Sequence, residues 1–137
     1  KVWIVPQDND LYLSYLCGQP MDWNAEAWRY NIFMDLDDNI ETGYRGWDNK
    51  WALGADYLVQ GATVYKFNGA ESNGWSWEDL GMCSYSVDGA QAEIAVPYSL
   101  IDLKQNQKIK VLFYGDNAKQ IDYVPDDYMD KALIVIK

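Results

Sequence analysis

The sequence predicts an all-β fold, an antiparallel β-sandwich of the jelly-roll kind, as one domain over residues 1–137. Short segments rich in β-branched and aromatic residues recur along the chain, and many alternate apolar with polar positions. Glycine-containing turns such as Gly61-Ala62 and Asp88-Gly89 separate them. A chain of 137 residues has the size of a single domain and buries roughly two-thirds of its unfolded surface, so one core is expected.

The first half of the chain holds the longest stretches of strand-forming residues. The opening segment 2–5 and the segment 11–16 consist largely of branched aliphatic and aromatic residues. Segment 29–35 follows, and segments 56–60 and 63–68 are separated by only two residues. A connection that short predicts a hairpin between the last two.

The second half continues in the same way. A strand is expected from Ser76 onward, and others over 91–96, 108–114, 120–124 and 132–136. Segment 108–114 has the clearest period of two, with Ile109, Val111 and Phe113 on the side expected to face the core.

Helical structure is expected only as single turns, at residues 24–27 and 97–101. Cys17 and Cys83 are the only cysteines, and both lie in strand-like segments. The sequence leaves open whether they form a disulfide or stay as two buried thiols, because it does not fix the distance between them.

The aromatic composition points to sugar binding. The chain has seven tryptophans and eleven tyrosines but only three phenylalanines and no histidine. Rings with a polar edge suit half-wet surfaces, where a flat indole can lie against the C–H face of a pyranose. For each single tryptophan, burial in the core is the alternative, since large aromatic side chains are mostly buried.

Charge excludes other partner classes. The formal net charge is −10 and the sequence pI is about 4.2, which disfavours nucleic acid and anionic membrane surfaces. No apolar run approaches the length of a membrane span. The chain opens at Lys1 on a strand-like segment without initiator Met or signal peptide, so we expect a module of a larger multidomain protein.

Strand direction predicts which loops meet. If successive strands alternate up and down, loops 36–54, 69–75, 97–107 and 125–131 share one end of the sandwich. This end carries the expected stacking platforms Trp47, Trp51 and Trp75, flanked by Tyr44 and Tyr128. Polar side chains placed to reach sugar hydroxyls are Asp48, Asn49, Lys50 and Asn73. The alternative is that Trp47 and Trp51 fold back and cap the end of the sandwich.

An acidic segment predicts a possible metal site. Asp35, Asp37, Asn39 and Glu41 place oxygen ligands at alternate positions, as calcium prefers. The segment is not an EF-hand, because Ile40 stands where the turn glycine should be and strands flank it. In the alternative, these side chains form Asx turns that hold the long loop by hydrogen bonds to the backbone.

Several motifs resemble those of bacterial carbohydrate-binding modules related to family 9 and the wider DOMON-like sandwich group. They are 33–39 (FMDLDDN), 42–44 (TGY), 54–59 (GADYLV), 64–67 (VYKF), 75–77 (WSW), 92–97 (AEIAVP) and 100–101 (LI). The resemblance covers most of residues 28–115. It implies a β-sandwich attached to a secreted or cell-surface protein, often with structural calcium, that binds glycan on exposed aromatic side chains.

The expected function is therefore a non-catalytic module that binds polysaccharide, a glucan first, with starch-type chains ahead of cellulose or xylan. Two other classes stay open. One is a sandwich that mediates protein–protein adhesion or scaffolding. The other is a small glycoside hydrolase, for which a carboxylate pair such as Asp48 with Asp56 would be required.

Overall fold

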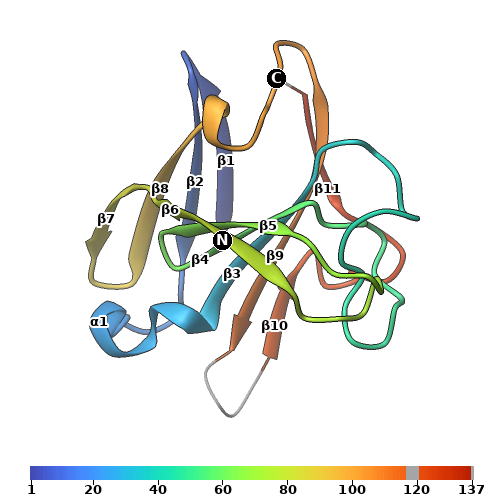
Figure 1. The fold of residues 1–137 in the computed structure, drawn as a ribbon. Helices are drawn as coiled ribbons and strands as arrows, with labels where there is room; N and C mark the ends of the chain where they lie inside the picture. Colours follow the sequence, from blue (N-terminus) through green and yellow to red (C-terminus); the bar gives the residue numbers. More distant parts are fainter. Residues whose placement is uncertain (117–120, 137) are drawn as a thin grey trace.

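The computed structural model describes residues 1–116 and 121–136, and two antiparallel sheets face each other in it (Figure 1). The smaller sheet has the strand order β1 (Val2–Gln7), β2 (Asp10–Leu16), β8 (Gln91–Pro97) and β7 (Ser84–Asp88). The larger sheet has the order β10 (Ile121–Val124), β9 (Lys108–Asp116), β3 (Tyr30–Asp35), β4 (Tyr57–Gln60), β5 (Thr63–Phe67) and β6 (Trp77–Met82), and β11 (Leu133–Ile136) also pairs with β9. The predicted all-β sandwich is confirmed.

Most predicted strands lie within a residue or two of the observed ones. The exception is β7, which the sequence analysis did not separate from the segment that begins at Ser76. Gln120, the first residue of one expected strand, lies outside the described residues. The two helical turns are present as α1 (Trp23–Glu26) and the 3-10 turn η2 (Tyr98–Leu100), and a further 3-10 turn, η1 (Ala27–Arg29), leads into β3.

The main core lies between the two sheets. Alternate residues of each strand point inward, and on β9 these are Ile109, Val111 and Phe113, as predicted. On β3 the inward residues are Ile32 and Met34. Phe33 has the opposite orientation and belongs to a second apolar cluster, on the outer face of the larger sheet. The larger sheet is therefore covered on both faces.

The long loops contact one another, but the predicted alternation of strand direction is wrong for loop 125–131. β10 and β11 both run antiparallel to β9, so this loop interrupts the edge beside β9 and does not turn at the end of a strand. The Arg45 amide donates to the Ser72 carbonyl over 2.7 Å, and the Ala52 amide donates to the Tyr128 carbonyl over 3.0 Å. The side-chain amide of Gln107 donates to the Leu36 carbonyl over 2.6 Å. These bonds join the loop between β3 and β4 to the three others that were expected beside it.

Cys17 and Cys83 are free thiols, half-buried and buried respectively. Within the described part of the chain, no helix is both long enough and apolar enough to cross a membrane.

Candidate functional site

The long loop between β3 and β4 folds back over the outer face of the larger sheet. Of its two tryptophans, Trp51 is only 1% exposed, so the prediction that Trp51 offers a stacking platform is wrong. The indole meets the Phe33 ring edge-on, with the ring centroids 4.7 Å apart. Phe33 points outward from β3, and the packing of Trp51 against it buries its ring.

Tyr44 is buried for the same reason and does not flank an exposed platform. It is 1% exposed and packs against Phe33 and Trp51, with ring centroids 5.9 Å and 5.4 Å away. Gly46 makes this packing possible, because a Cβ there would lie 2.5 Å from Nε1 of Trp51 and its φ of +79° is one that L side chains rarely adopt. The loop therefore forms a second core instead of a free end.

A groove remains open on this outer face, which we call the tryptophan groove. It has a volume of about 310 Å³. The buried rings of Phe33, Tyr44 and Trp51, which belong to the outer cluster, line it. Its walls include three tryptophans from three different segments, Trp28 from η1, Trp47 from the long loop and Trp75 from the loop between β5 and β6, and these are 55%, 55% and 54% exposed.

Two of the exposed tryptophans in the groove pack against other aromatic rings. Trp75 packs edge-on against Tyr44 and Trp77, with ring centroids 5.4 Å and 5.5 Å away. Trp47 packs edge-on against Trp51 and against Tyr114, and its ring centroid lies 6.0 Å from that of Tyr114. Rings held in this way lose little conformational freedom when a ligand binds, which favours stacking.

Polar side chains from several elements line the groove: Asn31 of β3, Gln60 of β4, Arg29 of η1, Asp116 of β9 and Asn73 of the loop between β5 and β6. The side-chain amide of Gln60 donates to Oδ1 of Asn31 over 2.8 Å, and the amide of Asn31 donates to the Trp28 carbonyl over 3.3 Å. The guanidinium of Arg29 lies 4.9 Å from the centre of the Trp28 ring. An amide side chain has two donors and two acceptor lone pairs. Gln60, which is half-buried, therefore keeps groups for a ligand hydroxyl.

Sequence reasoning missed Trp28, Asn31 and Gln60. The alternation of side chains along each strand could have indicated Asn31 and Gln60. Asn31 has the same parity on β3 as Phe33, and Gln60 has the same parity on β4 as Leu58, so all four lie on the outer face. Trp28 precedes the strand in a 3-10 turn, where strand parity does not apply.

Of the four polar residues that were predicted to contact sugar, only one lines the groove. Asn73 lines the groove. Asp48, Asn49 and Lys50 are exposed on the long loop but are not among the lining residues. Oδ1 of Asn49 accepts the Ser72 hydroxyl over 2.6 Å, and Oδ1 of Asp48 accepts the Lys50 amide, so both oxygens serve the loop itself.

Tyr128 also lies away from the groove. Its ring stacks on Tyr123 with centroids 3.7 Å apart, at the border of the outer cluster. It is half-buried and supports the aromatic layer from the side.

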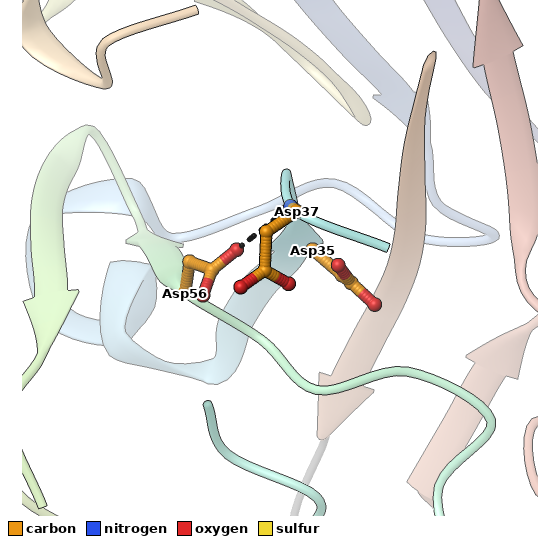
Figure 2. A group of neighbouring side chains, drawn as sticks. All are labelled: Asp35, Asp37 and Asp56. Atoms are coloured by element: carbon orange, nitrogen blue, oxygen red, sulfur yellow. Dashed lines mark hydrogen bonds between the residues drawn. The ribbon is translucent and has the colours of Figure 1, made fainter. Parts of the chain in front are cut away.

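The acidic segment forms a carboxylate cluster at the end of β3. Asp35, Asp37 and Asp56 each offer an oxygen, and these oxygens lie within 4.8 Å of one another (Figure 2). Asp56 directly precedes β4 and was not in the predicted ligand set, because it lies 20 residues after Leu36 in the sequence. In the structure the Leu36 amide donates to Oδ2 of Asp56 over 2.7 Å. Glu41 is exposed and is not part of the cluster.

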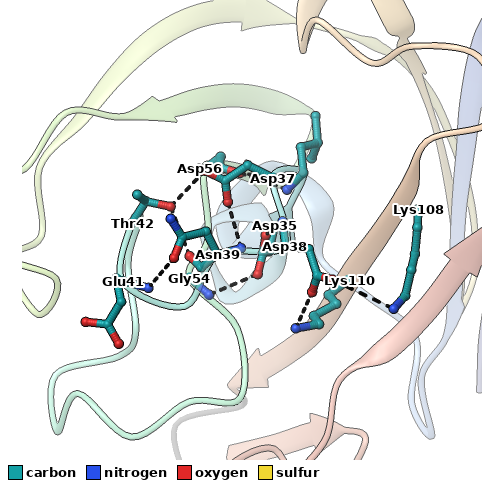
Figure 3. A network of polar contacts seen from close by, with 11 residues as sticks. Asp35, Asp37, Asp38, Asn39, Glu41, Thr42, Gly54, Asp56, Lys108 and Lys110 are labelled. Carbon is teal, nitrogen blue, oxygen red and sulfur yellow. Dashed lines mark hydrogen bonds and ion pairs between the residues drawn. The ribbon is translucent and has the colours of Figure 1, made fainter.

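Asx turns also hold this segment, as the alternative predicted (Figure 3). Oδ1 of Asp37 accepts the Asn39 amide over 2.9 Å, and Oδ1 of Asn39 accepts the Glu41 amide over 3.1 Å. The buried Asp35 accepts the amides of Asp38 and Gly54. Asn39 thus acts as a turn residue, while the three aspartates converge.

Burial and like charge shift the titration of this cluster. Burial raises the pKa of Asp56 to about 6, and the negative charges of Asp37 and Asp35 add to this effect. The hydrogen bond from the Leu36 amide acts in the opposite direction. Burial also raises the pKa of Asp35, although two backbone amides oppose it. A divalent cation would relieve this repulsion, and an all-oxygen donor set is what calcium takes.

These shifts predict how stability depends on pH when divalent cations are chelated. The folded pKa of Asp56 lies above the ordinary value of 3.8, so its stabilising contribution is complete below about pH 4 and is lost as pH rises through about 6. Urea unfolding of wild type and Asp56→Asn should show it: the stability of wild type relative to the variant falls across this window. A relative stability that rises with pH would contradict it.

Comparisons of the chain with protein-family models, with curated proteins and with solved structures find no match. The resemblance to carbohydrate-binding modules stays a prediction from the sequence.

Proposed function

We propose that this chain is a non-catalytic carbohydrate-binding module that holds a neutral polysaccharide in the tryptophan groove. The observation that carries the proposal is the set of three half-exposed indoles around a groove whose polar lining includes three amide side chains, beside Arg29 and Asp116. Indole faces suit the apolar faces of sugar rings, and amides exchange hydrogen bonds with their hydroxyls.

The preferred ligand is a glucan, with starch-type chains ahead of cellulose or xylan. The three tryptophans stand on separate segments around a pocket, and such a cupped arrangement suits a curved chain better than a flat one. A volume of about 310 Å³ is near the lower end of the range of about 300–1,000 Å³ for ligand pockets, so a short stretch of the chain is held.

Weak binding of this kind is useful when the module is tethered. In a secreted or cell-surface protein with further domains, it would keep a linked enzyme close to its substrate and so raise the effective concentration.

Two other functions have less support. A glycoside hydrolase needs paired carboxylates beside bound sugar. Asp48 and Asp56 do not line the tryptophan groove, and the oxygen of Asp56 accepts backbone amides. A protein adhesion module would use the acidic surface of the chain, whose net charge is −10.

Salt dependence separates the glycan from a charged protein partner. Stacking and hydrogen bonds to neutral hydroxyls leave little charge to screen, so binding of a malto-oligosaccharide should hardly change between about 0.05 and 0.5 M salt. Calorimetry at both ionic strengths is the measurement. A several-fold loss of affinity at the higher salt would favour a basic protein partner, recruited electrostatically.

We further propose that Asp35, Asp37 and Asp56 hold a calcium ion that stabilises the long loop without contact to sugar. The donor set fits: three carboxylates converge, and burial disfavours the charge of Asp35 and Asp56 when no cation is present.

Calcium is therefore expected to raise the melting temperature at pH 7, because a ligand of the native state stabilises it by mass action. The increase should be larger at pH 7 than at pH 5, since protons compete for Asp56 below its pKa of about 6. Asp56→Asn should remove most of the increase, whereas Asp88→Asn, in an exposed position on β7, should keep it. An unchanged melting curve with calcium and with chelator would leave the aspartates as turn residues.

A further inference from the structure

A second pocket opens at the side of the sandwich, and we call it the lateral pocket. It lies between the end of β2, the start of β3 and the end of β9, and its volume is about 820 Å³. This lies within the range of about 300–1,000 Å³ for small-molecule sites. Tyr15 and Phe113 line it and also belong to the core between the sheets, whereas the tryptophan groove lies on the outer face.

Aromatic rings from both sheets form one wall of the lateral pocket. Tyr15 of β2 stacks on Tyr30 of β3, with centroids 5.5 Å apart and an interplanar angle of 24°. Phe113 of β9 meets Tyr15 edge-on at 6.3 Å. Such a wall favours a flat, apolar ring as ligand.

Two glycines leave room in this pocket. Gly18 and Gly115 both line it, and a Cβ added to either would meet nothing within 4 Å. Gly115 follows Phe113 by two residues on β9, so both have the same orientation relative to the sheet. A side chain at Gly115 would enter the pocket without a clash at its first atom.

One buried polar group points to a hydrogen-bonding ligand. Tyr15 is 7% exposed, and its hydroxyl has no hydrogen-bond partner in the part of the chain that the structure describes. Buried polar groups are nearly always satisfied, so an orphan hydroxyl at a pocket wall needs a partner. Burial raises the pKa of Tyr15, which keeps the hydroxyl neutral and able to donate.

Charge at the rim selects against anions. Glu26, Asp116 and Asp122 all line the pocket. Lys1 also lines the pocket, and Nη1 of Arg29 lies 3.6 Å from Oε1 of Glu26, so two cations offset part of this charge. The carboxylates still outnumber Lys1 in the lining, and the chain as a whole carries a net charge of −10. A negatively charged ligand would be repelled.

From this combination we propose that the lateral pocket binds an uncharged, flat aromatic alcohol. Its ring lies against Tyr15, Tyr30 and Phe113, and its hydroxyl is a hydrogen-bond partner of the Tyr15 hydroxyl. The lateral pocket adjoins the tryptophan groove, because Asn31, Tyr114 and Asp116 line both.

The direct test uses 2-naphthol as probe, with 2-naphthalenesulfonate as the anion of similar shape, in equilibrium dialysis against the full chain at pH 7. We expect saturable binding of 2-naphthol and several-fold weaker binding of the sulfonate, because three carboxylates and one lysine line the pocket and the chain is negatively charged. Absence of saturable 2-naphthol binding, or equal binding of the two probes, would overturn the proposal.

Variants locate the probe. Gly115→Leu fills the pocket and should weaken 2-naphthol binding about tenfold or more. Gly18→Leu is a second filling variant from the other wall, in case the first does not fold. Tyr15→Phe should cost about three- to tenfold, as one lost hydrogen bond does. Tyr12→Phe, on the same strand with the opposite orientation, should cost nothing. Unchanged binding in both folded glycine variants, or in Tyr15→Phe, would contradict the assigned site.

Cys17 provides a reporter inside the pocket. It lines the lateral pocket and is half-buried, whereas Cys83 is buried elsewhere and serves as reference. Saturating 2-naphthol should slow alkylation of Cys17 by iodoacetamide several-fold at pH 9 and leave the rate at Cys83 unchanged. Equal rates at Cys17 with and without 2-naphthol would place the probe elsewhere.

Discussion

Trp51→Ala is expected to lower the free energy of unfolding by about 3–5 kcal/mol, as removal of a fully buried large aromatic side chain does. Trp51 is 1% exposed and meets Phe33, Tyr44, Trp47 and Tyr123. No other residue of the long loop has so large a buried side chain, so its loss would leave a cavity over Phe33. Chemical unfolding followed by circular dichroism measures the effect.

Trp47→Ala is the matched control, because it removes the same side chain from a position four residues away that is 55% exposed. It should cost about 1 kcal/mol or less of unfolding free energy, the usual size for a surface position with few contacts. Equal destabilisation by the two variants would contradict the proposed division between a buried and an exposed tryptophan.

The second large effect concerns binding. Trp28→Ala, Trp47→Ala and Trp75→Ala should each weaken glucan binding by about 1–3 kcal/mol, or roughly 5- to 150-fold, while the domain stays folded. Calorimetry with a malto-oligosaccharide gives the affinities. Trp3→Ala is the control, because Trp3 is 44% exposed but lies on β1 of the smaller sheet. A loss of affinity in Trp3→Ala with none in the other three would move the site to the opposite sheet.

The strands could be predicted because their burial follows a simple period. Ile109, Val111 and Phe113 face the core between the sheets, and the lysines at 108 and 110 identify this side in the sequence. Leu112 between them is buried in the outer cluster, which the period of two does not reveal. Strand direction also predicted that loops 36–54, 69–75 and 97–107 lie close together, but not the position of loop 125–131, which joins two strands that both run antiparallel to β9.

The site could be predicted only in part, because the path of a long loop depends on packing. Trp47 and Trp51 are both loop tryptophans in the sequence, and nothing local separates them. What separates them is Phe33, whose outward ring is covered by Trp51. Trp28 was missed because it lies in a 3-10 turn, where strand parity does not apply. Asp56 was missed because it reaches Asp35 and Asp37 only after the loop returns.

The central claim is that the tryptophan groove binds glucan, and affinity electrophoresis tests it most directly. Wild type, Trp3→Ala and the combined variant of Trp28, Trp47 and Trp75 to alanine are run in native gels containing starch, a soluble cellulose derivative or xylan. Wild type and Trp3→Ala should be retarded, most strongly by starch, and the combined variant should migrate as in a gel without polysaccharide. Unretarded migration of wild type in every gel, or equal retardation of the combined variant, would contradict the claim.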